Sequence, residues 1–219
     1  MSPIGNPDRW AVERSLLARG IERIAGVDEV GRGPLAGPVL AAAASFPSAT
    51  IRDSLPANLE GLTDSKQLTP RQREQYAAIL LRLPGFRHTL WRVDPPEIDA
   101  SNILAATHTA MRKALSLLDP PPDHALIDGL PVPGLPVPHT ALVRGDARSY
   151  SIAAASVLAK VTRDRLMVEY DREYPGYGFA RHKGYATAAH LEALARHGPC
   201  PIHRRSFAPL RSVQGELGL

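Results

Sequence analysis

Acidic side chains stand at several points where the sequence indicates that a buried strand ends. They are Asp28, Glu29, Asp128 and Asp146. Because the ends of neighbouring strands in an α/β sheet lie close in space, we expect these carboxylates to converge. Their repulsion requires a cation, and oxygen ligands of this kind suit Mg²⁺ or Mn²⁺ and suit zinc poorly. Two such ions about 4 Å apart activate a water and stabilise the leaving oxygen of a phosphodiester.

Each acid taken alone has a second interpretation. The pair Asp128-Gly129 is common in turns, and Asp146 fits a loop residue before a helix N-terminus. Asp28 and its neighbour Glu29 point to opposite faces of a regular strand. The metal-site hypothesis therefore depends on the joint occurrence of the four acids at strand ends.

A glycine-rich loop, residues 31–37, follows the first acidic pair. It is not GxGxxG, because the third glycine comes one residue late, and no Lys-Ser/Thr follows Gly37 as in a P-loop. Its bare backbone amides surround Arg32 and suit a phosphate or a closely approaching sugar. The alternative is a tight turn without chemistry.

The elements that must position these residues are predicted from hydrophobic period, glycine and proline. We expect strands at 21–30, 39–46, 86–93, 124–127 and 141–143. We expect helices at 8–19, 70–83, 96–118, 149–174 and 187–197. Thr69-Pro70 predicts the start of the second helix, with threonine as N-cap. Strands first and helices interleaved later indicate an α/β fold with a mixed sheet flanked by helices.

Composition limits the classes of protein. With 219 residues, 44% hydrophobic and 22% charged, the chain is an ordinary globular one that needs no disulfide or structural metal to fold. The single cysteine, Cys200, excludes an internal disulfide and suits a reducing cytoplasm. The N-terminus has no apolar signal segment, and the uncharged stretch 34–51 is better explained as a turn and a buried strand than as a membrane span.

Charge is distributed unevenly. Up to His139 the chain has 14 Lys and Arg against 15 Asp and Glu, whereas from Thr140 the counts are 12 and 7. Residues 181–211 contain six basic residues, four histidines and only one acid, Glu192. Such a segment favours a polyanion such as nucleic acid, and we expect its arginines and Lys183 to contact phosphates. The alternative is a solvated face in an arginine-biased chain, since only four of its 26 basic residues are lysine.

Six blocks of the sequence resemble bacterial ribonuclease HII. They are DEVGRGPLAGPV (28–39), DSKQLTPRQRE (64–74), LIDG (126–129), GDARSYSIAAASVLAKVTRD (145–164), HKGYATAAHL (182–191) and GPCPIHRRSFAP (198–209). They occur in the family's order and span nearly the whole chain. Three of the four lysines lie inside them.

The resemblance implies an RNase H-like fold with a helical C-terminal segment. It implies cleavage of RNA in RNA–DNA hybrids and incision 5′ of a single ribonucleotide in duplex DNA. By the same resemblance, Asp28, Glu29, Asp128 and Asp146 form a two-metal centre that uses Mg²⁺ or Mn²⁺. The motif Gly31-Arg32-Gly33 is expected to contact the ribonucleotide 2′-OH and its phosphates, and Tyr185 to stack on the following deoxyribose. The complete substrate-binding set that we predict is Gly31, Arg32, Gly33, Lys66, Ser149, Lys160, Lys183 and Tyr185.

Several of these residues have structural alternatives. Tyr185 suits packing at a helix entry, Lys160 suits an ion pair with Asp164, and residues 64–66 suit capping of the helix after them. Ser149 is best interpreted as the N-cap of the helix after Asp146, where it also presents that terminus to a phosphate. For the whole chain, the alternative to a nuclease is a non-catalytic nucleic-acid-binding module. Four intact acids argue against it, because a binder gains nothing from carboxylates that repel phosphates.

The expected organisation is a short N-terminal helical extension, residues 1–20, before one catalytic domain, residues 21–219. Ribonuclease HIII resembles this pattern less well, because it carries a further N-terminal domain and typically lysine in place of Arg32. We expect a cytoplasmic monomer that binds RNA–DNA hybrid and ribonucleotide-containing duplex. The short end after Leu210 gives no support for a sliding-clamp interaction.

Overall fold

The structure is a computed structural model that describes residues 8–210, so the expectations for both chain ends and for Arg211 lie outside the described residues. Its five strands are β1 (Ile24–Val30), β2 (Val39–Ser45), β3 (Arg87–Val93), β4 (His124–Asp128) and β5 (His139–Leu142). They form one sheet in the order β3-β2-β1-β4-β5. β2 is antiparallel to β1 and β3, whereas β4 is parallel to β1 and β5. The predicted mixed sheet is confirmed.

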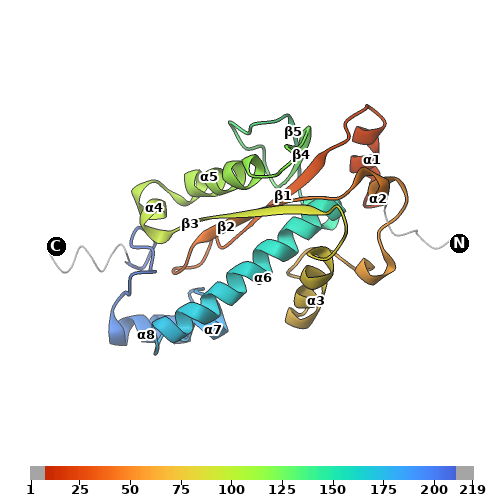
Figure 1. Ribbon diagram of the computed structural model, residues 1–219. Helices are drawn as coiled ribbons and strands as arrows, with labels where there is room; N and C mark the ends of the chain where they lie inside the picture. Colours follow the sequence, from red (N-terminus) through yellow and green to blue (C-terminus); the bar gives the residue numbers. More distant parts are fainter. Residues whose placement is uncertain (1–7, 211–219) are drawn as a thin grey trace, which may run out of the picture.

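Helices cover both faces of this sheet. The α-helices are α1 (Ala11–Leu17), α2 (Ser48–Arg52), α3 (Pro70–Leu80), α4 (Pro95–Ala100), α5 (Ile103–Ser116), α6 (Tyr150–Glu173), α7 (Phe179–His182) and α8 (Ala188–His197). Short 3-10 turns are η1 (Ala57–Leu59) and η2 (Gly145–Ala147). Figure 1 shows α6 and α3 on one face and α5 on the other. None of the helices among residues 8–210 has the length and apolar character that a membrane crossing requires.

The core is thin where the site must form, because small residues let helices approach the sheet. The alanines of β2, residues 41–44, are fully buried between the two helical layers. A Cβ on Gly26 of β1 would lie 2.1 Å from the backbone of Ser151 on α6, so only glycine fits there. The first turn of α6 is therefore pressed against β1, two residues before Asp28.

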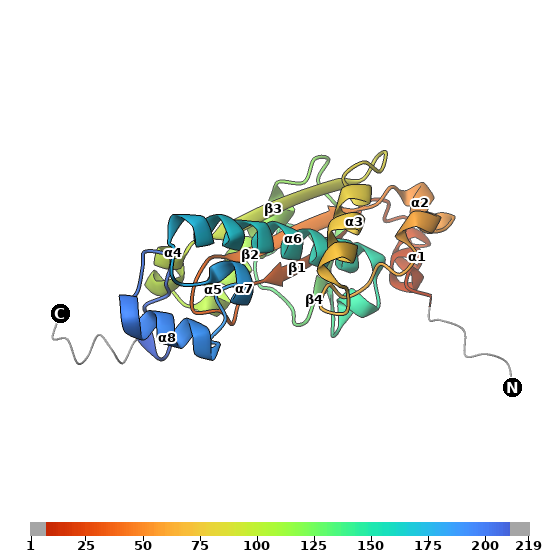
Figure 2. The ribbon, with the colours of Figure 1, turned by 90° about the horizontal axis from the view of Figure 1, so that it is seen from below.

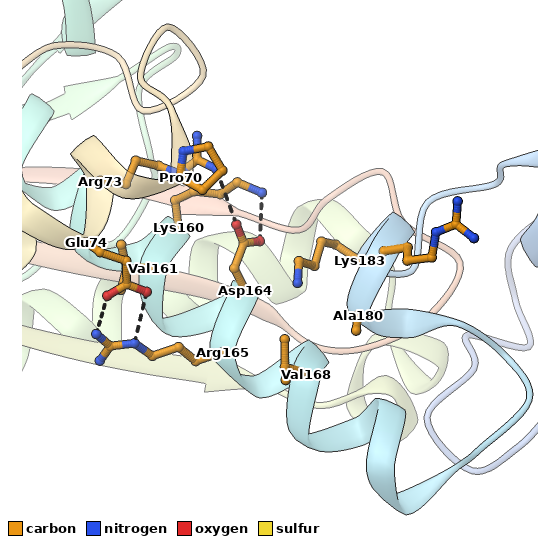
Figure 3. A pocket seen from close by; sticks show the side chains of 11 residues that line it. Pro70, Arg73, Glu74, Lys160, Val161, Asp164, Arg165, Val168, Ala180 and Lys183 are labelled. Carbon is orange, nitrogen blue, oxygen red and sulfur yellow. Dashed lines mark hydrogen bonds and ion pairs between the residues drawn. The ribbon is translucent and has the colours of Figure 1, made fainter.

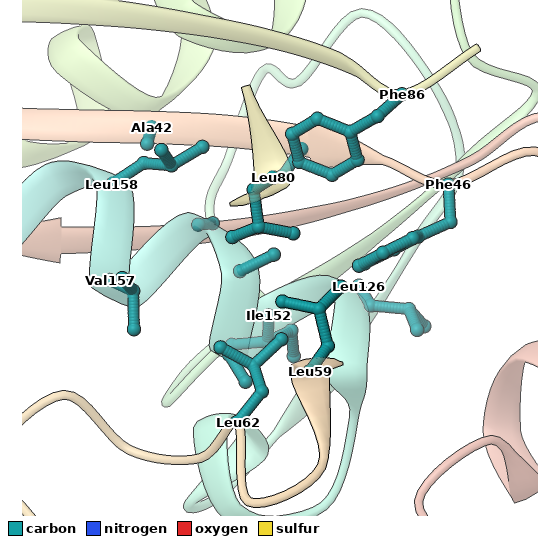
Figure 4. Close-up of a cluster of buried hydrophobic side chains, with 14 of the residues drawn as sticks. Ala42, Phe46, Leu59, Leu62, Leu80, Phe86, Leu126, Ile152, Val157 and Leu158 are labelled. Carbon is teal, nitrogen blue, oxygen red and sulfur yellow. The ribbon is translucent and has the colours of Figure 1, made fainter. Parts of the chain in front are cut away.

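The larger hydrophobic cluster lies between the sheet, α6 and α3. Figure 4 shows Phe46, Phe86 and Leu126 from the sheet side meeting Ile152 and Leu158 of α6. Trp10, Leu16 and Leu17 of the N-terminal segment belong to the same cluster. The N-terminal segment around α1 is therefore packed against the same core as the sheet, α6 and α3.

A smaller hydrophobic cluster packs the C-terminal segment against the glycine loop. Its buried residues are Ala36, Met167, Tyr177, Phe179, Ala193, Cys200 and Ile202. Figure 2 shows α7 and α8 gathered beside the last turns of α6. Leu35 N donates to Gly184 O at 2.8 Å and Gly37 N donates to Ile202 O at 2.9 Å, which ties the loop to this segment. The expected helical C-terminal segment is confirmed.

The structure departs from the predicted elements in a few places. The helix expected over 96–118 is broken between α4 and α5, because the side chain of Asn102 accepts from Ala105 N at 2.9 Å and starts a new helix. The first strand begins at Ile24 rather than at residue 21, and α2 and α7 were not predicted. The Thr69 cap of α3 is confirmed as a capping box with Gln72.

Candidate active site

Asp28 lies on β1 and faces α6. Side chains alternate along a strand, so Asp28 shares the face of Gly26, the point of closest approach to α6. Only 6% of Asp28 is exposed, and the hydroxyl of Ser156 on α6 acts against the rise that burial causes in its pKa. Asp28 Oδ1 also accepts from Glu29 N at 2.7 Å. Asp28 is therefore buried where α6 packs most closely against β1.

Asp128 ends the neighbouring strand β4, which runs parallel to β1 with Ile127 beside Val27. Its Oδ1 accepts from Gly145 N at 2.6 Å, which joins the end of β4 to η2. Gly129 follows with φ +85°, a conformation that glycine adopts without strain. The turn interpretation of Asp128-Gly129 and the metal-ligand hypothesis are therefore compatible.

Asp146 lies in η2, between β5 and the start of α6. It is 6% exposed, and its backbone carbonyl accepts from Arg9 Nη2 at 2.5 Å. Arg9 also donates to Leu62 O. The N-terminal segment, the loop before α3 and the active-site turn are thus held together by one buried guanidinium. No pattern in the sequence indicates this role for Arg9.

These three aspartates form one cluster. Asp28, Asp128 and Asp146 each offer a carboxylate oxygen, and the three oxygens lie within 4.8 Å of one another. Burial and the negative charges of Glu29 and Asp128 hold the pKa of Asp28 well above its usual range. Burial and the charges of Asp128 and Asp64 raise the pKa of Asp146 to about 6. Such crowding is unfavourable without a cation, so the donor set fits a bound divalent ion.

Glu29 stands beside the cluster and is not one of its three groups. Its carboxylate lies 3.3 Å from Arg32 Nη1, on the opposite strand face from Asp28. Burial raises its pKa, and the charge of Arg32 acts in the opposite sense. The structure therefore brings together three of the four predicted acids, with the fourth paired to the glycine loop.

Lys66 and Asp64 approach the cluster from the loop before α3. The pKa of Lys66 is raised, because the charges of Asp28 and Asp64 outweigh the lowering by burial. Asp64 Oδ1 accepts from Lys66 N at 2.9 Å, which makes a local turn. Thr69 caps α3, so the alternative in which residues 64–66 cap that helix is wrong. Lys66 is placed where an ammonium offsets the acidic charge.

Ser149 is fully buried and caps α6. Its Oγ accepts from Ile152 N at 3.2 Å and donates to Glu13 Oε1 at 2.6 Å. The N-cap prediction is confirmed. Its contact with substrate stays a prediction, and the lack of exposed surface favours the capping role.

Lys160 and Lys183 line a groove of about 470 Å³ between α3, α6 and α7. Lys160 Nζ bonds to Asp164 Oδ1 at 2.7 Å, the predicted pair one helical turn apart. Figure 3 shows Lys183 extending from the α7 side toward Asp164. Burial lowers the pKa of Lys183, and Lys160 also contributes to the lowering. Arg73 and Arg181 complete a mostly basic wall.

The glycine loop and Tyr185 lie side by side. Arg32 and Gly33 are exposed, whereas Gly31 is buried. A Cβ placed on Gly33 would lie 3.8 Å from Tyr185 Cε1, so the ring borders the loop. Tyr185 is 44% exposed, which fits a surface contact better than helix-entry packing.

Sequence reasoning was wrong about Arg204. We expected it to contact phosphates, but it is fully buried and its guanidinium donates to Gly37 O, Arg32 O and Gly31 O. Arg163 on α6 is buried in the same way. A signal for Arg163 was available, because Ala159, Arg163 and Met167 recur at the four-residue spacing of a buried helix face.

A mixed sheet with three aspartates gathered beside β1, the end of β4 and η2 defines a metal-dependent nuclease with an RNase H-like fold. The family profile described as Ribonuclease HII matches residues 25–210. The ribonuclease HII of Geobacillus kaustophilus is 54% identical over 201 residues, covering 92% of this chain and 74% of the relative. That of Moorella thermoacetica is 54% identical over 198 residues, covering 90% and 92%.

Solved structures agree with the fold. The crystal structure of ribonuclease H2 from Pyrococcus horikoshii has a TM-score of 0.74 at 29% identity, covering 90% of this chain and 99% of that one. The chain belongs to the ribonuclease HII family. It is accordingly a metal-dependent endoribonuclease, and the resemblance found in the six sequence blocks is confirmed.

Proposed function

We propose that this ribonuclease cleaves the RNA strand of RNA–DNA hybrids and incises on the 5′ side of single ribonucleotides in duplex DNA. The observation that supports this most directly is the cluster of three aspartates within 4.8 Å. Asp28, Asp128, Asp146 and Glu29 would hold two Mg²⁺ or Mn²⁺ ions. Bound ions of this kind supply a nucleophilic water and stabilise the leaving oxygen. The negative charges of the four carboxylates would bind these ions.

The protein's own residues orient the strand to be cut. The exposed amides of Arg32 and Gly33 offer donors to a phosphate or a sugar hydroxyl, and the 2′-OH is what distinguishes RNA from DNA at a fixed base. The ring of Tyr185 lies beside them, in place to stack on the next sugar. Lys66, Lys160 and Lys183 offer positive charges to the phosphates of the same strand. Ser149 contributes by capping α6.

A non-catalytic binding module fits the site less well. The clustered carboxylates, among which Asp28 and Asp146 have raised pKa values, repel the phosphates that such a module must attract. We further propose that the protein acts as a cytoplasmic monomer, in keeping with its buried free Cys200.

The test is divalent-dependent nicking of a duplex that contains one ribonucleotide. The unchanged protein should cut only with Mg²⁺ or Mn²⁺ present, and should leave an all-DNA duplex of the same sequence intact. D28N and D146N should lower the rate by more than about a hundredfold, since outer-shell partners alone are worth 10–100-fold. Duplex binding and the folded state should remain. Near-normal nicking by both variants at saturating Mg²⁺ would contradict the assignment.

A further inference from the structure

Two arginines lie fully buried behind the glycine loop. Arg163 belongs to α6, and Arg204 follows α8 in the C-terminal segment. Within the part of the chain that the structure describes, neither guanidinium forms an ion pair with a carboxylate. Burying an arginine without such a partner is costly and rare, so hydrogen bonds to other groups must offset that cost.

Arg204 binds the carbonyls of the loop itself. Its Nε donates to Gly37 O at 2.9 Å, its Nη1 to Arg32 O at 2.9 Å and its Nη2 to Gly31 O at 2.5 Å. All three nitrogens of one planar group are used, and the fork therefore spans the loop from its first residue to its last.

Arg163 binds the same loop from the helix side. Its Nε donates to Pro38 O and its Nη2 to Ala36 O, both at 3.0 Å. Its Nη1 donates to Lys183 O, also at 3.0 Å, in the turn that leads to Tyr185. A Cβ on Gly31 would lie 2.3 Å from Arg163 Nε, so a glycine at this position is what admits the guanidinium. Arg163 thus joins the loop to the turn that carries Tyr185.

The bonds of Arg204 determine where two backbone amides point. In a trans peptide the C=O and N–H directions are opposite. Because Gly31 O and Arg32 O point inward to Arg204, the N–H groups of Arg32 and Gly33 point outward. Both residues are exposed, and among residues 8–210 neither amide has a protein acceptor. Two successive outward amides form a cradle for an anion.

We propose that Arg163 and Arg204 are positioning residues that hold these two amides and the Tyr185 ring as one rigid surface for the nucleotide. Neither guanidinium reaches the substrate, because both are covered by the loop they hold. The inference rests on the proposed function, in which this loop and Tyr185 bind the embedded ribonucleotide. It deepens that function by assigning the geometry of the surface to two side chains that lie behind it.

The test uses R163K and R204K, which keep the charge and lose the planar fork. Each should lower kcat/KM at a single embedded ribonucleotide, mainly by raising KM. We expect a loss of about tenfold to a hundredfold, since a 1 Å misplacement far from the chemistry costs up to 10²-fold. The Mg²⁺ concentration that gives half-maximal rate should stay unchanged, because the aspartate cluster has other supports.

Two control variants separate positioning from charge and from stability. R82Q changes an exposed arginine just beyond the end of α3, to which no binding role is assigned, and should leave KM nearly unchanged. L115A weakens the core on the α5 face and should alter the rate only in proportion to the folded fraction. If neither lysine variant folds, D99N loosens the same segment more mildly, because Asp99 accepts from Arg205 N and Ser206 N. It should raise KM to a lesser extent.

The outcomes distinguish this inference from the function on which it rests. If the unchanged protein does not prefer a ribonucleotide-containing duplex over all-DNA duplex, the proposed function fails. If the unchanged protein does prefer the ribonucleotide-containing duplex, and R163K and R204K have the same KM as the unchanged protein at equal folded fraction, only the positioning role is overturned. An unchanged KM in D99N, where that variant has to be used, overturns it in the same way.

Discussion

At the scale of single residues, the aspartate cluster sets function against stability. In the absence of a cation, Asp28 and Asp146 are held among like charges in a buried place, and both pKa values are raised. A carboxyl whose pKa is higher in the folded state destabilises that state when ionised. The metal-free protein is therefore less stable near neutral pH than it would be with one of these charges removed.

This leads to a prediction for D146N in the metal-free protein. At pH 7.5 the free energy of unfolding of the variant should exceed that of the unchanged chain by about 1–2 kcal/mol, since one pKa unit corresponds to 1.36 kcal/mol. The advantage should shrink as the pH falls through about 6, where Asp146 becomes protonated. The measurement is denaturant unfolding with a chelator present, at a series of pH values.

The comparison must be a difference between the two proteins, because buried histidines titrate over the same range. Burial lowers the pKa of His190, and that of His203 to about 4, so acid destabilises both proteins alike. Adding Mg²⁺ should reverse the order and make the unchanged protein the more stable one. If D146N is less stable than the unchanged protein at every pH without metal, repulsion between the carboxylates does not destabilise the folded state.

Tyr185 carries a second prediction at this scale. Replacing it with alanine should lower cleavage at a single embedded ribonucleotide more than cleavage within a continuous RNA strand, where no deoxyribose follows the cut. The ring borders Gly33 and is partly exposed, so its loss removes a contact surface and little core. The ratio of the two rates is the measurement. Equal losses on both substrates would show that the tyrosine is structural.

At the scale of elements, the start of α6 positions Asp146, and Ser149 is the residue that starts it. Its hydroxyl caps the helix and donates to Glu13, whose other carboxylate oxygen is buried without a partner. S149A should lower the free energy of unfolding by about 0.5–2 kcal/mol, the usual range for a lost N-cap. At matched folded fraction its KM for duplex should equal that of the unchanged protein. A raised KM with unchanged stability would indicate substrate contact instead.

The elements show how far sequence patterns lead. The existence of the five strands, the Thr69-Pro70 cap and the long helix after Ser149 follow from local periodicity and capping and are confirmed, whereas the bounds of the first and last strands differ from those predicted. The break at Asn102 was missed, because a polar side chain there competes with a helix that periodicity alone would continue. Arg204 was assigned to the surface from its charge, and only the three-dimensional contacts reveal its carbonyl partners. Unlike Arg163, whose position on a buried helix face follows from helical spacing, Arg204 lies in an irregular segment with no local sequence signal for its burial.

At the scale of the whole molecule, the correction at Arg204 changes which cations meet the polyanion. The exposed basic residues of the C-terminal segment include Arg181, beside the groove that holds Lys183, and Arg205. Phosphates are the same at every base sequence, so these side chains should contribute to binding of every duplex alike. The salt dependence of binding measures their number.

The final prediction therefore concerns R181Q combined with R205Q. Each lost phosphate contact should flatten the slope of log binding constant against log salt by roughly 0.9 for B-form DNA. Affinity for all duplexes should fall, with the cleavage position unchanged. The control is R82Q, an exposed arginine just beyond the end of α3, which removes one positive charge and should leave the slope unchanged. Y185A should also leave the slope nearly unchanged, since a ring releases no counterions. An unaltered slope in the double variant would mean that Arg181 and Arg205 do not meet phosphates and that Lys160 and Lys183 carry the electrostatic contact instead.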